Sequence, residues 1–191
     1  MCKIIVMANQ KGGVAKTSST RNLAYSLAEL GKKVLAVDFD PQTNLTISFG
    51  VAPAALQETA ASLMMKLVMD EVLPEKTSYI LNIGKVDLLP SKKTLTVAEV
   101  NLLIERKDDC LSKLLAPLRT DYDYILVDTG PSLGSLTINA FTAADEIIIP
   151  IDPELFALVG LKELTETISK IKQNLNPKLE IIGILSVSYT H

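Results

Sequence analysis

The chain has 191 residues, of which 48% are hydrophobic and 21% are charged, and its formal net charge is −3. This composition predicts one globular domain with a full core and excludes a strongly basic nucleic-acid-binding protein. There is no apolar run long enough for a transmembrane helix and no secretory signal pattern, and neither Cys2 nor Cys110 has metal or disulfide spacing. We therefore expect a cytoplasmic protein that does not bind membranes. The one histidine is His191, which argues against histidine-based catalysis.

Apolar runs and helical spacing alternate along the chain. The predicted strands are residues 3–8, 33–38, 86–90, 122–128, 146–151 and 179–187. The predicted helices are residues 17–30, 58–73 (ended by Pro74), 96–118 in two pieces, 133–143 and 154–173. This alternation predicts an α/β fold with a doubly wound, mainly parallel sheet flanked by helices in three layers.

Polar residues gather where the predicted strands end. Asn9 and Gln10 follow the first strand, Asp38 and Asp40 follow the second, and Asp128 and Asp152 come at the ends of two later strands. These positions share one edge of a parallel sheet, and open α/β sheets bind ligands at that edge. The sequence thus predicts a ligand site there.

The stretch "NQKGGVAKTSST", residues 9–20, follows the first predicted strand. The general phosphate-loop pattern is Gly-x-x-x-x-Gly-Lys-[Ser/Thr], and Lys16 and Thr17 fill its last two positions, whereas Gln10 and Ala15 replace its glycines. Lys16 can place a charge on the β- and γ-phosphates of ATP, and Thr17 can bind Mg²⁺. The predicted nucleotide-binding residues are Lys11, Gly12, Gly13, Val14, Ala15, Lys16, Thr17 and Ser18. The alternative is a turn without a ligand.

The segment "KGGVAKTS" fits a deviant pattern, Lys-Gly-Gly-x-x-Lys-[Ser/Thr], and in this it resembles the ParA/MinD group of P-loop ATPases. The resemblance implies a homodimer with two ATP molecules at its interface, in which Lys11 acts on the nucleotide of the partner subunit. Most members of the group have glycine at the position of Ala15. If the backbone there needs a positive φ, alanine costs about 1 kcal/mol.

Two further segments are similar to ParA sequences. "VLAVDFDPQTNLT", residues 34–46, implies that Asp40 orients the attacking water and that Asp38 lies near the Mg²⁺ shell; the alternative for Asp38 is a capping acid at a turn. "YDYILVDTGPSLG", residues 122–134, resembles the Walker B strand, and implies that Asp128 binds Mg²⁺ through a water. Gly130 replaces the usual proline, which we expect to loosen the loop after this strand.

The resemblance extends from residue 3 to about residue 187 and favours the ParA/Soj branch, which implies an ATPase switch in plasmid or chromosome segregation and a ParB-like partner. A MinD-like ATPase is an alternative, and a non-catalytic nucleotide-binding module is another. We interpret residues 1–191 as a single P-loop ATPase domain that is truncated at its C-terminus relative to the family. The usual continuation supplies much of the DNA-binding surface, so we expect weak binding to nonspecific DNA. Ser186 to Tyr189 would border the nucleotide base.

Overall fold

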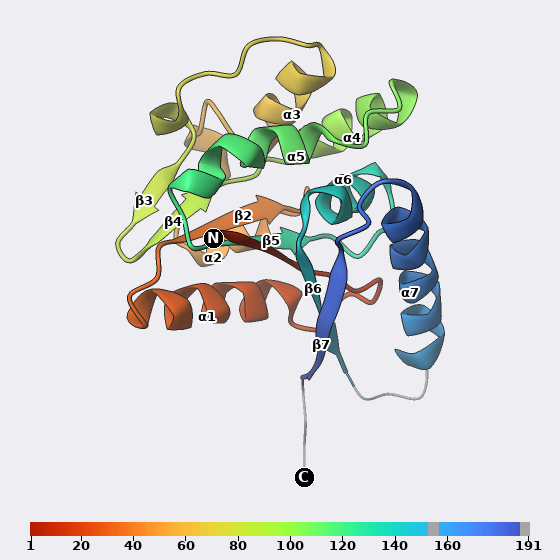
Figure 1. Ribbon diagram of the computed structural model, residues 1–191. Coiled ribbons are helices and arrows are strands. Elements are labelled where there is room, and N and C mark those ends of the chain that lie inside the picture. The colour runs from red at the N-terminus through yellow and green to blue at the C-terminus, as the bar shows by residue number, and fades with distance from the viewer. Residues whose placement is uncertain (153–156, 188–191) are drawn as a thin grey trace.

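The computed structural model describes residues 1–152 and 157–187. Within these ranges a seven-stranded sheet has the order β3-β4-β2-β5-β1-β6-β7 (Figure 1). The strands are β1 (Lys3–Met7), β2 (Val34–Phe39), β3 (Leu81–Ile83), β4 (Val86–Leu89), β5 (Tyr124–Thr129), β6 (Glu146–Ile151) and β7 (Glu180–Ser186). β3 pairs antiparallel with β4, and every other pairing is parallel.

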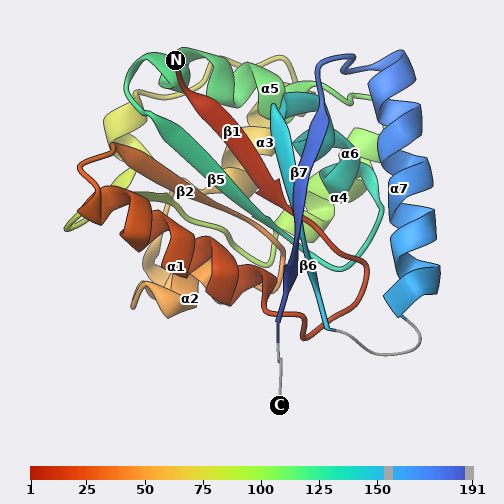
Figure 2. The same ribbon diagram turned by 60° about the horizontal axis from the view of Figure 1, so that its bottom comes forward.

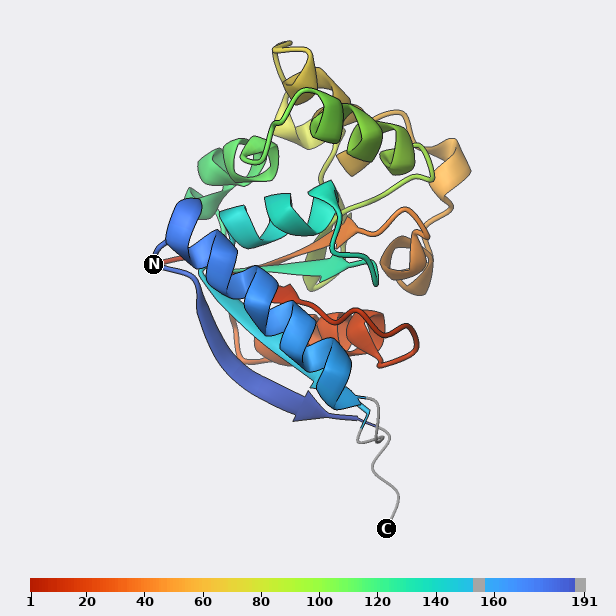
Figure 3. The same ribbon diagram turned by 90° about the vertical axis from the view of Figure 1, so that its right-hand side faces the viewer.

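Helices cover both faces of the sheet. The α-helices are α1 (Lys16–Glu29), α2 (Asn44–Ser48), α3 (Ala60–Val68), α4 (Leu95–Ile104), α5 (Cys110–Leu115), α6 (Ser135–Ala143) and α7 (Ala157–Asn174), and short 3-10 turns are η1 (Pro53–Ala55), η2 (Lys76–Ser78) and η3 (Ala116–Thr120). α1 and α2 lie on one face, while α3, α4, α5 and α6 lie on the other (Figures 1 and 2). Figure 3 shows α7 alongside α6 and over β6. The expected three-layer α/β fold is confirmed.

The central strands are buried on both faces because their sequences are nearly continuous apolar runs. Every residue of β2 is buried, and so are four of the five residues of β1. Successive side chains point to opposite layers: Val6 and Val127 join the larger core beneath α3–α6, whereas Ile5 and Leu126 join the smaller core beneath α1 and α2. This double burial fixes the ends of β1, β2 and β5 at one rigid edge.

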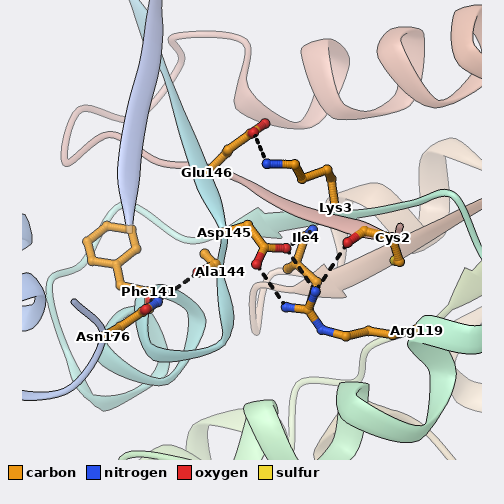
Figure 4. Close-up of polar contacts among 9 residues, drawn as sticks. All are labelled: Cys2, Lys3, Ile4, Arg119, Phe141, Ala144, Asp145, Glu146 and Asn176. Atoms are coloured by element: carbon orange, nitrogen blue, oxygen red, sulfur yellow. Dashed lines mark hydrogen bonds and ion pairs between the residues drawn. The ribbon is translucent and has the colours of Figure 1, made fainter. Parts of the chain in front are cut away.

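The start of β1 is tied to the start of β6 by a polar network at the amino edge of the sheet (Figure 4). Arg119 makes two contacts with the Asp145 carboxylate, at 3.0 and 3.2 Å, and donates a third hydrogen bond to the carbonyl of Cys2. Asp145 also accepts from the backbone N–H of Ile4 at 2.8 Å, while Asn176 donates to the carbonyls that end α6. Arg119 and Asp145, the charged groups of this network, are therefore matched to each other.

The structure corrects some of the expected boundaries. The helix predicted to end at Pro74 is α3, which stops at Val68. Two residues further on, Asp70 has a left-handed φ of 55°. β2 and β5 each continue one residue past Asp38 and Asp128, so neither acid is the last residue of its strand, as the predicted ranges had it. Two short elements, α2 and β3, were not predicted. The predicted division of residues 96–118 into two helices is confirmed by α4 and α5.

Candidate active site

The glycine-containing loop between β1 and α1 lies at the carboxyl edge of the sheet. Asn9 anchors its start: its side-chain amide donates to the carbonyl of Pro150 in β6 at 2.6 Å, and its Oδ1 accepts from the N–H of Lys11 at 3.0 Å. Gly13 and Ala15 both have left-handed backbones, with φ of 77° and 56°. The positive φ considered for Ala15 is therefore real, and alanine costs about 1 kcal/mol there.

Helix α1 begins at Lys16 without a side-chain cap. Ala15 is its N-cap residue, and alanine has no oxygen that could accept a hydrogen bond from the first turn. The first N–H groups of a helix have no partner within the helix, and together with the helix dipole they favour an anion at this position. The end of α1 that faces the loop is thus suited to a phosphate group.

Lys16 is buried within the loop and is only 7% exposed. Its ammonium donates to the carbonyl of Asn9 at 2.9 Å and to the carbonyl of Lys11 at 3.1 Å. Burial lowers the pKa of Lys16, and the charges of Asp128 and Asp40 oppose that effect. A positive charge is therefore held in a setting where water screens it poorly, which strengthens its attraction to an anion.

Thr17, in the first turn of α1, contacts Asp128 of β5. The Thr17 hydroxyl donates to Oδ2 of Asp128 at 2.6 Å, while Oδ1 of Asp128 is buried and has no hydrogen-bond partner among the described residues. Burial raises the pKa of Asp128 to about 7. A buried carboxylate oxygen without a partner is uncommon, and a hydrated Mg²⁺ would supply the missing donor. The orphaned oxygen therefore fits the predicted metal site.

Asp38 stands beside Asp128 on the neighbouring strand, in register with it. Its Oδ2 accepts from both the N–H and the hydroxyl of Thr46, at 2.8 and 2.6 Å, and its Oδ1 accepts from the N–H of Asp40 at 3.3 Å. Burial raises the pKa of Asp38 to about 6. Asp38 thereby connects β2 to α2; its place near the Mg²⁺ shell stays a prediction.

Asp40 follows β2 and faces the loop after β5. Its Oδ1 accepts from the N–H of Gln42 at 2.9 Å, and the carboxylate packs against Gly130. A side-chain Cβ at Gly130 would lie 3.2 Å from Oδ1 of Asp40, closer than such contacts normally are. The missing side chain of Gly130 therefore makes room for the Asp40 carboxylate, while the expected loosening of its loop stays a prediction.

These residues border a cleft of about 550 Å³, which is in the range of small-molecule sites. The cleft is lined by Gly12, Gly13, Ala15, Lys16, Thr17 and Ser18 from the loop and α1, and by Asp40, Gln42, Asn44 and Pro131 from the facing segments. Among the predicted residues, Val14 is buried and outside this lining, and so are Asp38 and Asp128. Lys11 is also outside the lining of the cleft, and its Nζ lies 3.7 Å from Oδ2 of Asp152.

Several features of the site were missed or remain untested. Thr46 was not expected to hold Asp38, because nothing in the sequence marks a threonine eight positions away as its partner. Gln42 and Asn44 lie in the quoted "DPQTN" segment, which could have assigned them to the cleft. Of the residues predicted to border a base, Ser188 and Tyr189 lie outside the described residues. Among the described residues, those of this site included, no group of three Cys, His, Asp or Glu side chains could hold a metal ion.

Comparison with known proteins supplies the family. A family profile described as an AAA domain matches residues 2–181. The chain is 42% identical over 190 residues to an uncharacterised protein of Mycobacterium tuberculosis, covering 98% of this chain but 58% of the relative. It is 41% identical over 191 residues to the chromosome-partitioning ATPase Soj of Treponema pallidum, covering 99% of this chain and 72% of that protein.

A solved structure is similar throughout the described fold. Cobyrinic acid a,c-diamide synthase from Mycobacterium smegmatis, with a bound ATP analogue and magnesium, has a TM-score of 0.90 and 36% identity, covering 99% of this chain and 74% of that one. The fold, the loop with its two lysines and the matched relatives agree. The chain belongs to the ParA/Soj family of P-loop ATPases.

Proposed function

We propose that this protein is a ParA/Soj-like partition ATPase that hydrolyses ATP and acts in the segregation of a plasmid or chromosome. The proposal rests on its likeness to a chromosome-partitioning ATPase and on the paired Thr17 and Asp128 beside the glycine-containing loop. The single observation that carries it is the buried, unpartnered Oδ1 of Asp128. A nucleotide with its metal would complete a site that the protein alone leaves incomplete.

The loop residues bind and neutralise the triphosphate in this proposal. Gly12 and Gly13 let the backbone approach the phosphates, and the start of α1 adds its N–H donors and dipole. Lys16 exchanges the carbonyls of Asn9 and Lys11 for phosphate oxygens. Thr17 and Asp128 would hold a magnesium ion, Asp128 through a water. Magnesium, when bound, neutralises charge on the phosphates as the bond to the terminal phosphoryl group breaks.

Asp40 orients the water that attacks the terminal phosphate. Its carboxylate is held by the N–H of Gln42 and faces the cleft, and Gly130 leaves it room to align with a water. Phosphoryl transfer depends mainly on positioning and charge neutralisation, so a fixed carboxylate at this place is sufficient to set the direction of attack.

The remaining parts of the proposal concern assembly. Two chains face each other across two ATP molecules, and each Lys11 leaves Asp152 to reach the nucleotide of the partner subunit. A ParB-like protein stimulates turnover of the ATP-bound dimer in the cytoplasm. Association of the dimer with DNA belongs to the whole protein, and we expect this chain to bind nonspecific DNA weakly. This chain spans 58% of the M. tuberculosis relative, so the activity and partners of a whole protein belong to the proposal.

Phosphate release by the purified chain tests the catalytic part. We expect slow release of phosphate from Mg-ATP, at least about tenfold slower release with Asp40→Ala and undiminished ATP binding by that variant. Asp121→Ala, an exposed carboxylate at the other edge, is the matched control and should release phosphate at the parent rate. If Asp40→Ala also hydrolyses ATP at the parent rate, Asp40 does not orient the water. Binding without any release would favour a non-catalytic module.

A further inference from the structure

A second hollow lies at the amino edge of the sheet, at the opposite end from the nucleotide cleft. It encloses about 510 Å³ and shares no lining residue with that cleft. Its walls come from the turn after α1, from η2, from the β3–β4 hairpin and from the residues before β5. In Figure 1 the hairpin and the end of α1 lie together at the left, whereas the loop that starts α1 lies at the right. We call this hollow the amino-edge pocket.

The charge of the amino-edge pocket is opposite to that of the whole protein. Four lysines line it, together with two aspartates, on a chain whose formal net charge is −3. The charged lining residues are Lys32, Lys33, Lys76, Lys85, Asp87 and Asp121. The lysines come from three separate segments that only the fold brings together. The pocket therefore has a local excess of positive charge that the composition does not suggest.

The two aspartates already have partners within the protein. Asp87 accepts from the side-chain amide of Asn82 and from the hydroxyl of Tyr122, both at 2.8 Å. Asp121 pairs with Lys76 at 2.6 Å. Lys85 contacts Glu29 at 3.4 Å, but both side chains are about two-thirds exposed, and such pairs contribute little. An incoming anion would therefore meet lysines more readily than free carboxylates.

One wall of the pocket is suited to a ring. Ile80 and Tyr122 are half-buried and supply apolar surface, and the Tyr122 hydroxyl is fixed on Asp87. Burial, followed by that hydrogen bond to Asp87, raises the pKa of Tyr122, so the hydroxyl remains a donor to Asp87. The pocket thus combines an apolar wall with a rim of ammonium groups, and its volume fits a small ligand.

We propose that the amino-edge pocket binds a small organic phosphate of about mononucleotide size, with the phosphate among the lysines and the ring against Ile80 and Tyr122. Lysine is a common phosphate partner that acts as a point charge. The proposal concerns a site separate from the ATP cleft and does not depend on hydrolysis.

The test uses uridine 5′-monophosphate as the probe and the Lys16→Ala chain, in which the ATP cleft is disabled. Backbone amide resonances are followed by NMR during titration, with uridine as the uncharged control. We expect saturable shifts at Lys33, Asn82 and Tyr122, with uridine binding at least about tenfold more weakly. The same amides should shift in the parent chain, which guards against a folding defect in Lys16→Ala.

Charge reversal gives the matched comparison. Lys76→Glu combined with Lys85→Glu should weaken the binding of the probe at least about tenfold, because two attractive charges become repulsive. Lys113→Glu combined with Lys162→Glu makes the same change in net charge on exposed lysines elsewhere and should leave binding unchanged. Absence of shifts at the pocket, or equal loss in both double variants, would overturn the proposal. So would stronger shifts of the same amides by a short DNA duplex, which would assign the lysines to a nucleic-acid backbone.

Discussion

At the amino edge of the sheet Asp145 faces an arginine, whereas at the carboxyl edge Oδ2 of Asp128 accepts from a threonine and its Oδ1 has no hydrogen-bond partner among residues 1–152 and 157–187. Both carboxylates lie beside β1, at its two ends. Asp145 makes hydrogen bonds that tie strands together, while Asp128 and Asp38 sit next to each other with their pKa values raised by burial. The protein pairs both oxygens of the Asp145 carboxylate at one edge and, among the described residues, leaves one oxygen of Asp128 unpaired at the other.

The carboxyl edge also contains residues with strained backbone conformations. Ala15, which lines the nucleotide cleft, and Thr43, which is buried between the lining residues Gln42 and Asn44, are non-glycine residues with left-handed backbones. Strained residues and unpaired buried groups persist where the surrounding structure holds them, and they gather at functional sites. We infer that the paired groups at the amino edge stabilise the fold, and that this stabilisation offsets the free-energy cost of the strained and unpaired groups at the carboxyl edge.

Removing the arginine should produce the largest change in stability. Arg119→Ala leaves Asp145 without its cation and the Cys2 carbonyl without its donor, so we expect a loss of about 1–3 kcal/mol in the free energy of unfolding. Urea denaturation of the nucleotide-free chain measures it. Lys113→Ala, which removes an exposed pair with Asp109, should cost less than about 0.5 kcal/mol. Equal losses in the two variants would contradict the contrast between the edges.

Removing negative charge at the carboxyl edge should raise the free energy of unfolding, whereas removing Arg119 should lower it. The folded pKa of Asp128 is raised to about 7 from an ordinary value of 3.8, so between these values the folded state binds more protons than the unfolded state. Stability should therefore fall as pH rises from about 5 to above 7, by about 2 kcal/mol, in the magnesium-free chain. Urea denaturation at several pH values measures this slope.

The Asp128→Asn variant sharpens the same prediction. It should be more stable than the parent above pH 7 and should have a shallower dependence on pH, because its side chain carries no charge. Asp121→Asn is the control, since that carboxylate is exposed and paired with Lys76. A parent chain that gains stability between pH 5 and pH 7 would show that Asp128 is ionised at low cost.

Relief of backbone strain at the loop should have the smallest effect. Ala15→Gly removes the penalty of a left-handed alanine, against the larger entropy of glycine in the unfolded chain, so we expect a gain of about 0.5 kcal/mol. Ala28→Gly, inside helix α1, should instead destabilise by about 0.5–1 kcal/mol. Thermal unfolding of both variants compares them, and a loss of stability with Ala15→Gly would contradict the assigned strain.

Local patterns were sufficient to predict much of this molecule. The apolar runs of β1, β2 and β5 identified the buried strands, and the spacing of Lys11, Lys16 and Thr17 identified the loop. The partners of Asp38 and Asp145 could not be predicted, because Thr46 and Arg119 reach them only through tertiary packing. β3 was missed because three residues are too few to show a period, and α2 because its five residues carry no apolar stripe.

Calorimetric titration of Mg-ATP into the chain tests the central claim, that the loop from Asn9 to Ser18 binds a triphosphate. The parent should bind one ATP per chain, and Lys16→Ala should bind it at least about tenfold more weakly, because a buried charge that faces the phosphates is lost. Lys113→Ala should bind as the parent does. No heat of binding by the folded parent, or equal affinity in Lys16→Ala, would contradict the account.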